Sequence, residues 1–225
     1  MTNTDKQTTE YLEPAPDGSI SAELIVAPVS QQAKGKRKAK LQKILRREFR
    51  KYKFYYSGEV AVHITWYGRE DRRYETIDDP DVDNIVKPIL DALSGIEGVM
   101  FDDCQVQHVS STWIDTEGID QLEIRIENPM KTFIPKQNIV FIKYSPNRCY
   151  PLSVDKNMTK DSILNLLASI ESALIKRDKI QKEKGYMEAK AVMPIQTLFH
   201  LSRINSFPVV EYDNISSYLD KLFAK

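Results

Sequence analysis

Residues 78–105 read DDPDVDNIVKPILDALSGIEGVMFDDCQ, and we expect this stretch to decide the fold. Its apolar residues recur at helical spacing and predict an amphipathic helix with one face on a core. They are Val86, Ile89, Leu90 and Leu93. Because proline is tolerated in the first turn of a helix, Pro88 predicts a start near Asn84, with Asp83 at or near the N-cap. Gly95 and Gly98 are expected to end the helix.

Two pairs of acidic residues flank this helix. Asp81 and Asp83 precede it, and Asp102 and Asp103 follow a glycine-containing loop and a short apolar run. Like charges about 4 Å apart repel by roughly 4 kcal/mol at an effective dielectric of 20, so gathering them favours a counter-ion. A hard cation such as Mg²⁺ accepts carboxylates, water and phosphate oxygens.

A purely structural interpretation of the same residues stays open. An aspartate before a helix is an ordinary cap, which contributes about 1 kcal/mol. Asp83, Lys87 and Asp91 lie four residues apart in turn, so they could form two surface ion pairs of roughly 0.3–0.5 kcal/mol each.

The segment D-V-D-N-I-V-K-P-I-L-D-A-L, followed by F-D-D-C-Q-V, resembles the RusA family of Holliday junction resolvases. That family has the pattern D-x-D-N-x-x-K, then D-A-L, then D-D-x-Q-V. Residue types, spacing and order agree over the whole segment, and the resemblance covers about Ser21 to Asn128.

The resemblance implies an Mg²⁺-dependent endonuclease for four-way DNA junctions, acting as a homodimer. Its metal ligands would be Asp81, Asp83 and Asp103, with Asp102 in support. Its catalytic residues would be these three acids and Lys87. A two-fold dimer would present one site to each of the two symmetric strands of a junction.

Length and composition fit an ordinary globular protein. The chain has 225 residues, of which 41% are hydrophobic and 28% charged. No apolar run is long enough for a membrane span, and the polar first 19 residues do not form a secretory signal. The two cysteines, Cys104 and Cys149, form no metal or disulfide framework, which favours a reducing, cytoplasmic setting.

One strongly basic block stands out in a chain of zero net charge. Lys34 to Lys53 contains a single acid, and its apolar residues fall at helical spacing. Like-charged helical neighbours repel, and a polyanion would relieve that repulsion, so we expect contact with DNA phosphates. A solvated surface, or membrane or calmodulin binding, is an alternative. The candidate DNA-binding residues here and in the charged segment 68–76, which we expect to be a loop, are Lys36, Lys38, Arg46, Arg47, Arg50, Arg69, Arg72 and Arg73.

Residues 20–130 predict an α/β (α+β) nuclease domain. Residues 21–27 form an expected strand, and residues 59–67 alternate with Val60, Val62, Ile64 and Trp66 on one face. Residues 105–114 predict a further strand, which the turn 115–120 joins to a partner strand carrying Leu122, Ile124 and Ile126. The sheet is expected to be mixed and mostly antiparallel, with helices on one face.

The flanking segments carry no recognised chemistry. Residues 1–19 predict a disordered tail. Residues 131–225 predict a mainly helical extension, with a strand at 138–144, a loop at 145–153 and helices near 159–184, 195–202 and 215–223. This extension could bind a protein partner, pack on the core or support dimerisation.

Two other functions remain open. The chain could be a non-catalytic branched-DNA-binding or adaptor protein that uses a nuclease-like core as a platform. It could also be a nuclease for flaps or forks instead of four-way junctions.

Overall fold

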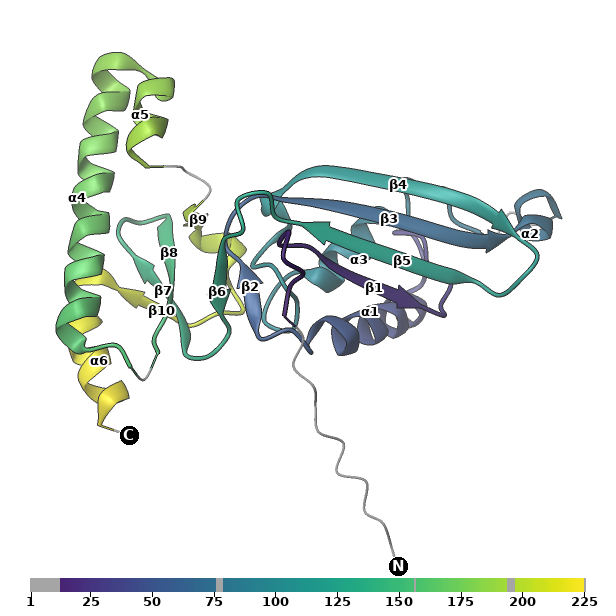
Figure 1. Cartoon of the computed structure of the whole chain (residues 1–225), viewed down its shortest axis with the longest axis horizontal. Coiled ribbons are helices and arrows are strands. Elements are labelled where there is room, and N and C mark those ends of the chain that lie inside the picture. Colours follow the sequence, from purple (N-terminus) through teal and green to yellow (C-terminus); the bar gives the residue numbers. More distant parts are fainter. Residues whose placement is uncertain (1–12, 76–78, 156, 194–196, 225) are drawn as a thin grey trace, which may run out of the picture. The chain divides into compact units, whose positions relative to one another are not determined.

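The computed structural model describes residues 13–75, 79–155, 157–193 and 197–224 (Figure 1). The chain divides into two compact units, Met1–Phe133 and Ile134–Lys225. Within the described residues, no helix is both long and apolar enough to pass through a membrane.

The first unit is built on a four-stranded sheet in the order β1-β5-β3-β4. These strands are β1 (Ile20–Leu24), β3 (Val60–Arg69), β4 (Val106–Thr116) and β5 (Gln121–Glu127). β5 runs antiparallel to both β1 and β3, whereas β3 and β4 are parallel. The predicted mixed, mostly antiparallel sheet is therefore confirmed.

The expected hairpin between β4 and β5 is wrong. β5 is consecutive to β4 in the chain but lies between β1 and β3, and β4 is on the edge beside β3 (Figure 1). The register pairs Trp66 of β3 with Trp113 of β4 on one side and with Leu122 of β5 on the other. The turn after β4 therefore carries the chain past β3 instead of folding it back on β4.

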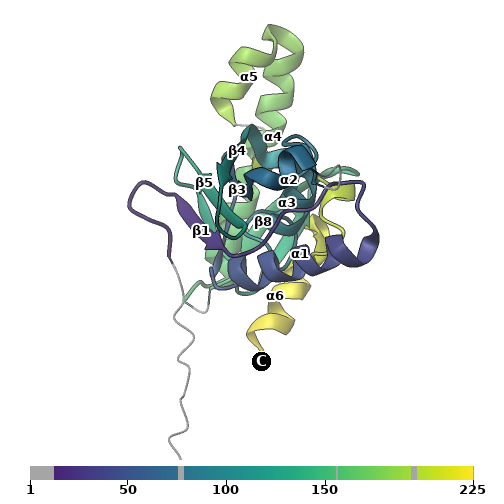
Figure 2. The ribbon, with the colours of Figure 1, turned by 90° about the vertical axis from the view of Figure 1, so that its right-hand side faces the viewer.

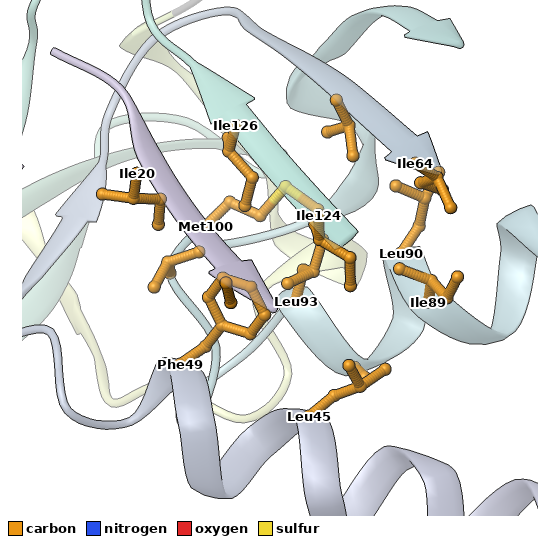
Figure 3. Packing of buried hydrophobic residues seen from close by; sticks show 14 of the residues in the cluster. Ile20, Leu45, Phe49, Ile64, Ile89, Leu90, Leu93, Met100, Ile124 and Ile126 are labelled. Carbon is orange, nitrogen blue, oxygen red and sulfur yellow. The ribbon is translucent and has the colours of Figure 1, made fainter. Parts of the chain in front are cut away.

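Two helices cover one face of this sheet. They are α1 (Gly35–Phe49) and α3 (Val86–Leu93), and Figure 2 shows them on the same side of it. Leu45 and Phe49 of α1 meet Ile89 and Leu93 of α3 beneath Ile124 and its neighbours on the strands (Figure 3). The apolar rows predicted for β3 and β5 are buried as expected and form the other side of this core.

Several boundaries in the first unit differ from the prediction. α3 begins at Val86, and its N-cap is Ile85 with no side-chain cap bond, so the predicted cap by Asp83 is wrong. Pro88 still lies in the first turn, which is why the later start is allowed. The segment expected to be a charged loop forms helix α2 (Glu70–Glu75), and the buried strand β2 (Phe54–Tyr56) was not predicted.

The chain after α3 turns tightly and returns to the same region. Gly98 lies so close to the end of α3 that a Cβ there would meet the Leu93 carbonyl oxygen at 2.0 Å. Val99, Met100 and Phe101 are buried, as predicted. They lead into the short 3-10 helix η1 (Asp103–Gln105) just before β4.

The N-terminal tail prediction falls mainly on residues 1–12, which lie outside the described residues. Residues 13–19 are described and contact the first unit: the Tyr56 hydroxyl donates to the Gly18 carbonyl oxygen at 3.0 Å. The Asp17 carboxylate accepts from the Ser19 hydroxyl and backbone, and these two bonds hold the pKa of Asp17 below its usual value.

The second unit combines helices with a second four-stranded sheet. The helices are α4 (Lys160–Lys184), α5 (Tyr186–Val192) and α6 (Ile215–Phe223), with 3-10 turns η3 (Leu201–Arg203) and η4 (Tyr212–Asn214). The sheet has the order β10-β7-β8-β9. Its strands are β7 (Ile139–Lys143), β8 (Arg148–Ser153), β9 (Phe199–His200) and β10 (Val209–Glu211), and β6 (Phe133–Pro135) lies at the boundary of the units.

The predicted strand at 138–144 and the helices near 159–184 and 215–223 are confirmed, the first helix with Thr159 as its N-cap. The loop expected at 145–153 is wrong, because β8 pairs antiparallel with β7 there. The helix expected near 195–202 is also wrong in its described part, which contains β9 and the first residues of η3.

Candidate active site

The backbone of the D-V-D segment is fixed from two sides. The Ser111 hydroxyl on β4 donates to the Val82 carbonyl oxygen at 2.9 Å. On the other side, the Gln31 backbone N–H donates to the Asn84 carbonyl oxygen at 2.8 Å. These two bonds tie the segment that carries Asp81 to the edge of the sheet and to the loop before α1.

The Asp81 and Asp83 side chains are both exposed, but they do not share one environment. Asp81 lines a polar cavity of about 520 Å³ between the loop at residues 27–33 and the D-V-D segment. Arg37 and Arg72 line the same cavity, whereas Asp83 does not. Arg37 belongs to the basic block but was not singled out from the sequence, since nothing in a run of similar cations distinguishes it.

Lys87 lies between two carboxylates. Its ammonium nitrogen is 2.6 Å from Oδ2 of Asp103 and 2.6 Å from Oδ1 of Asp91. Lys38 of α1 approaches the other oxygen of Asp91 at 3.4 Å. The hydrogen bonds to Asp103 first, and then to Asp91, raise the pKa of Lys87 above its ordinary value. The structure therefore brings Lys87 and Asp103 together, as the site prediction requires.

Asp102 has a structural task beside Asp103. Its carboxylate accepts from the Cys104 backbone N–H at 3.0 Å and caps η1. The backbone of η1 is thereby set so that the next residue, Asp103, projects toward Lys87.

The buried side chain of Gln105 holds this turn to the core. Its carbonyl oxygen accepts from the backbone N–H of Phe101 at 2.7 Å and of Asp102 at 3.3 Å. Its amide donates to the carbonyl oxygens of Tyr56 and Gly58 at 2.8 and 2.9 Å. Gln105 was quoted only as part of the motif, and a burial of 4% exposed area explains why a glutamine with these four partners is needed there.

The three arginines around α2 each pair with acids in this structure. The pairs are Arg69 with Asp71, Arg72 with Asp79 and Asp120, and Arg73 with Asp115. Arg72 therefore links α2 to the residues just before the D-V-D segment and to the turn before β5. The Arg73 guanidinium also lies 5.1 Å from the ring centre of Trp113. Their predicted contact with DNA stays a prediction.

The basic residues of α1 are not equally available. Lys36 and Arg47 are exposed, and Lys38 is only 27% exposed because it lies against Asp91. Arg46, Arg47 and Arg50 border a groove of about 370 Å³. The helix thus presents cations along its outer side, as phosphate contact would require.

The donor chemistry of Asp81, Asp83 and Asp103 suits a hard divalent cation, which prefers oxygen ligands. Within the described ranges, however, no group of three or more His, Cys, Asp and Glu side chains is arranged to hold a metal ion. The cation beside Asp103 in this structure is instead the ammonium of Lys87.

The comparisons with known proteins point to one family. Residues 28–127 match the family model described as endodeoxyribonuclease RusA. The matched residues all lie in the first unit and include the D-V-D segment, α3 and η1. No curated protein matches the chain.

Proposed function

Because residues 28–127 belong to the RusA endodeoxyribonuclease family, we propose that the protein is a structure-selective endonuclease that cuts four-way DNA junctions. The observation that carries the proposal is the meeting of Lys87 with Asp103 beside the D-V-D segment. It joins the first and last parts of the family motif in one place, although sixteen residues separate the two side chains.

The reaction would be direct hydrolysis. Water supplies the oxygen of the new P–O bond, the bond to the leaving sugar oxygen breaks, and a proton from the water ends on that oxygen. The Lys87 ammonium would offset negative charge on the phosphate or the leaving oxygen. Asp81, Asp83 and Asp103, with Asp102 in support, are the residues that would hold a divalent cation, with Mg²⁺ the cation we expect. A bound cation of this kind supplies Lewis-acid polarisation of the phosphate.

Substrate binding would use cations outside this centre. The outer side of α1 offers Lys36, Arg46 and Arg47, and the cavity beside Asp81 offers Arg37. A homodimer would supply two such sites to the two symmetric strands of a junction.

The test is cleavage of a synthetic four-way junction beside a linear duplex and a flap, with Mg²⁺ or with EDTA. Wild type is compared with Asp83→Asn and with Asp213→Asn, which makes the same change at an exposed acid of η4 in the second unit. We expect symmetric, Mg²⁺-dependent cuts in the junction that Asp83→Asn abolishes and Asp213→Asn retains.

Other results would change the proposal in defined ways. Cleavage of the flap alone would keep the nuclease and replace the substrate. Tight junction binding without cleavage in Mg²⁺ or Mn²⁺ would overturn the enzyme and favour a branched-DNA adaptor. Calorimetric titration with Mn²⁺ tests the cation separately, because Asp81→Asn should weaken binding whether or not DNA is cut.

A further inference from the structure

Asp91 divides its two carboxylate oxygens between two lysines from different helices. Oδ1 lies 2.6 Å from Lys87, one turn earlier on α3, and Oδ2 lies 3.4 Å from Lys38 on α1. The Lys38 and Asp91 side chains are only 27% and 29% exposed. Asp91 is therefore the link between the basic helix and the lysine at the candidate active centre.

Helix stability does not account for this arrangement. A pair four residues apart on a helix contributes little, and the order with the lysine before the acid is the less favourable one. Asp91 also lies in the last turn of α3, where a negative charge opposes the helix dipole. The placement is better explained by what Asp91 does to the Lys87 side chain.

Lys87 is held from two directions by acids of unlike position. Asp103 approaches from η1 and Asp91 from its own helix, each at 2.6 Å. A lysine has a long flexible stem, and two short charge-assisted bonds remove much of that freedom. If Asp91 were neutral, Asp103 alone would fix the ammonium, and its direction would be less well defined.

We propose that Asp91 is a positioning residue that aims Lys87 and couples it to the DNA-binding helix α1 through Lys38. This inference rests on the proposed function. DNA phosphates at α1 compete with Asp91 for Lys38. Binding of the substrate then leaves the Asp91 carboxylate to Lys87 alone and tightens its hold at the moment when a phosphate is present.

The experiment separates binding from turnover. Single-turnover cleavage rates and junction dissociation constants are measured for wild type, Asp91→Asn, Asp91→Glu, Lys38→Gln and the Asp91→Asn/Lys38→Gln double variant. Glu97→Gln is the matched control, because Glu97 also pairs with a cation of α1, Arg50, at 3.8 Å but does not touch Lys87. Acetylation of Lys87 at one fixed pH, read by mass spectrometry, gives a signal that does not depend on cleavage.

We expect Asp91→Asn to lower the cleavage rate about 10- to 100-fold while junction affinity stays within about twofold. Asp91→Glu should restore most of the rate. The double variant should cleave no more slowly than Asp91→Asn, since Lys38 acts through Asp91. Lys87 should be acetylated faster in Asp91→Asn, and more slowly in Lys38→Gln.

Equal cleavage and labelling in Asp91→Asn and Glu97→Gln would overturn the proposal, as would additive losses in the double variant. Should Asp91→Asn fail to fold, slower labelling of Lys87 in Lys38→Gln still supports the link, and unchanged labelling refutes it. A wild type that cuts none of the DNAs would overturn the proposed function alone, because the labelling would still show whether Asp91 holds Lys87.

Discussion

The ammonium nitrogen of Lys87 lies 2.6 Å from a carboxylate oxygen of Asp103, and this bond joins helix α3 to the turn before β4. Both side chains are partly open to solvent, at 46% and 27% exposed. A pair in such a position adds little to the free energy of unfolding, since solvent screens it. Its importance lies in where it holds a positive charge.

Replacing Lys87 by methionine should therefore separate activity from stability. We expect Lys87→Met to lower junction cleavage about 100- to 1000-fold, because one preorganised charge is lost. The change in unfolding free energy should stay below about 1 kcal/mol. Cleavage rates and urea denaturation provide the two readings. Lys51→Met is the control, because Lys51 makes an ion pair of the same 2.6 Å length with Glu48 at similar exposure. Equal losses of cleavage in both variants would contradict a special role for Lys87.

Gln105 should matter through its buried hydrogen bonds. Gln105→Leu leaves two backbone N–H groups and two carbonyl oxygens without their partner, which we expect to cost about 3 kcal/mol of unfolding free energy. Cleavage should also fall in the variant that remains folded, because Asp103 loses its support. Gln107→Leu, at an exposed position of β4, is the comparison and should shift the urea midpoint only slightly. A Gln105→Leu protein as stable as Gln107→Leu would contradict the prediction.

Two glycines should respond in opposite ways to alanine. A Cβ at Gly98 would lie 2.0 Å from the Leu93 carbonyl oxygen, so Gly98→Ala must move backbone and should cost about 3 kcal/mol or more. Gly35, the first residue of α1, has nothing within 4 Å of its added Cβ. We expect Gly35→Ala to be neutral or more stable by up to about 1 kcal/mol. Thermal unfolding of the two variants checks the contrast, and equal melting temperatures would contradict it.

Alkaline pH should destabilise the first unit through Tyr55. Burial raises the pKa of this phenol from 10.0 to about 12, and its hydroxyl donates to the Ile96 carbonyl oxygen at 2.8 Å. Above pH 10 the unfolded chain ionises before the folded one, so stability is present below pH 10 and is lost as the pH rises toward 12. At pH 11 the loss from Tyr55 should be about 1.4 kcal/mol relative to pH 8.

Urea unfolding at pH 8 and pH 11 measures this loss. Tyr55→Phe should be about 1 kcal/mol less stable at pH 8 because of the missing hydrogen bond, yet it should lose less stability on going to pH 11. The same pH dependence in wild type and variant would show that Tyr55 is not responsible.

Much of the first unit was predictable because its apolar residues follow regular periods. The alternating row Val60, Val62, Ile64 and Trp66 is buried as predicted, and so is the row of β5. Alternation defines which face of a strand is buried, but it does not define which strand is the neighbour. For that reason the turn at residues 115–120 was mistaken for a hairpin, although β4 pairs with β3 and β5 pairs with β1 and β3.

The candidate site was predictable in its residue types and less so in its contacts. The motif indicated Lys87 and Asp103, and the structure brings these two together. Asp91 was interpreted as one member of a surface ion pair, because its second partner, Lys38, lies more than fifty residues earlier in the chain. The role of Gln105 depends on carbonyl groups of β2 and the turn after it, and β2 itself has no alternation that would reveal it.

The insertion of β5 between β1 and β3 has a consequence for synthesis on the ribosome. Ile20 of β1 pairs with Ile126 of β5, so β1 waits for about 100 further residues, roughly 5–20 s of translation. Until then the apolar row of β1 and the inner edge of β3 have no strand to cover them. The nascent first unit therefore cannot complete its sheet strand by strand, and its final folding step follows the emergence of β5.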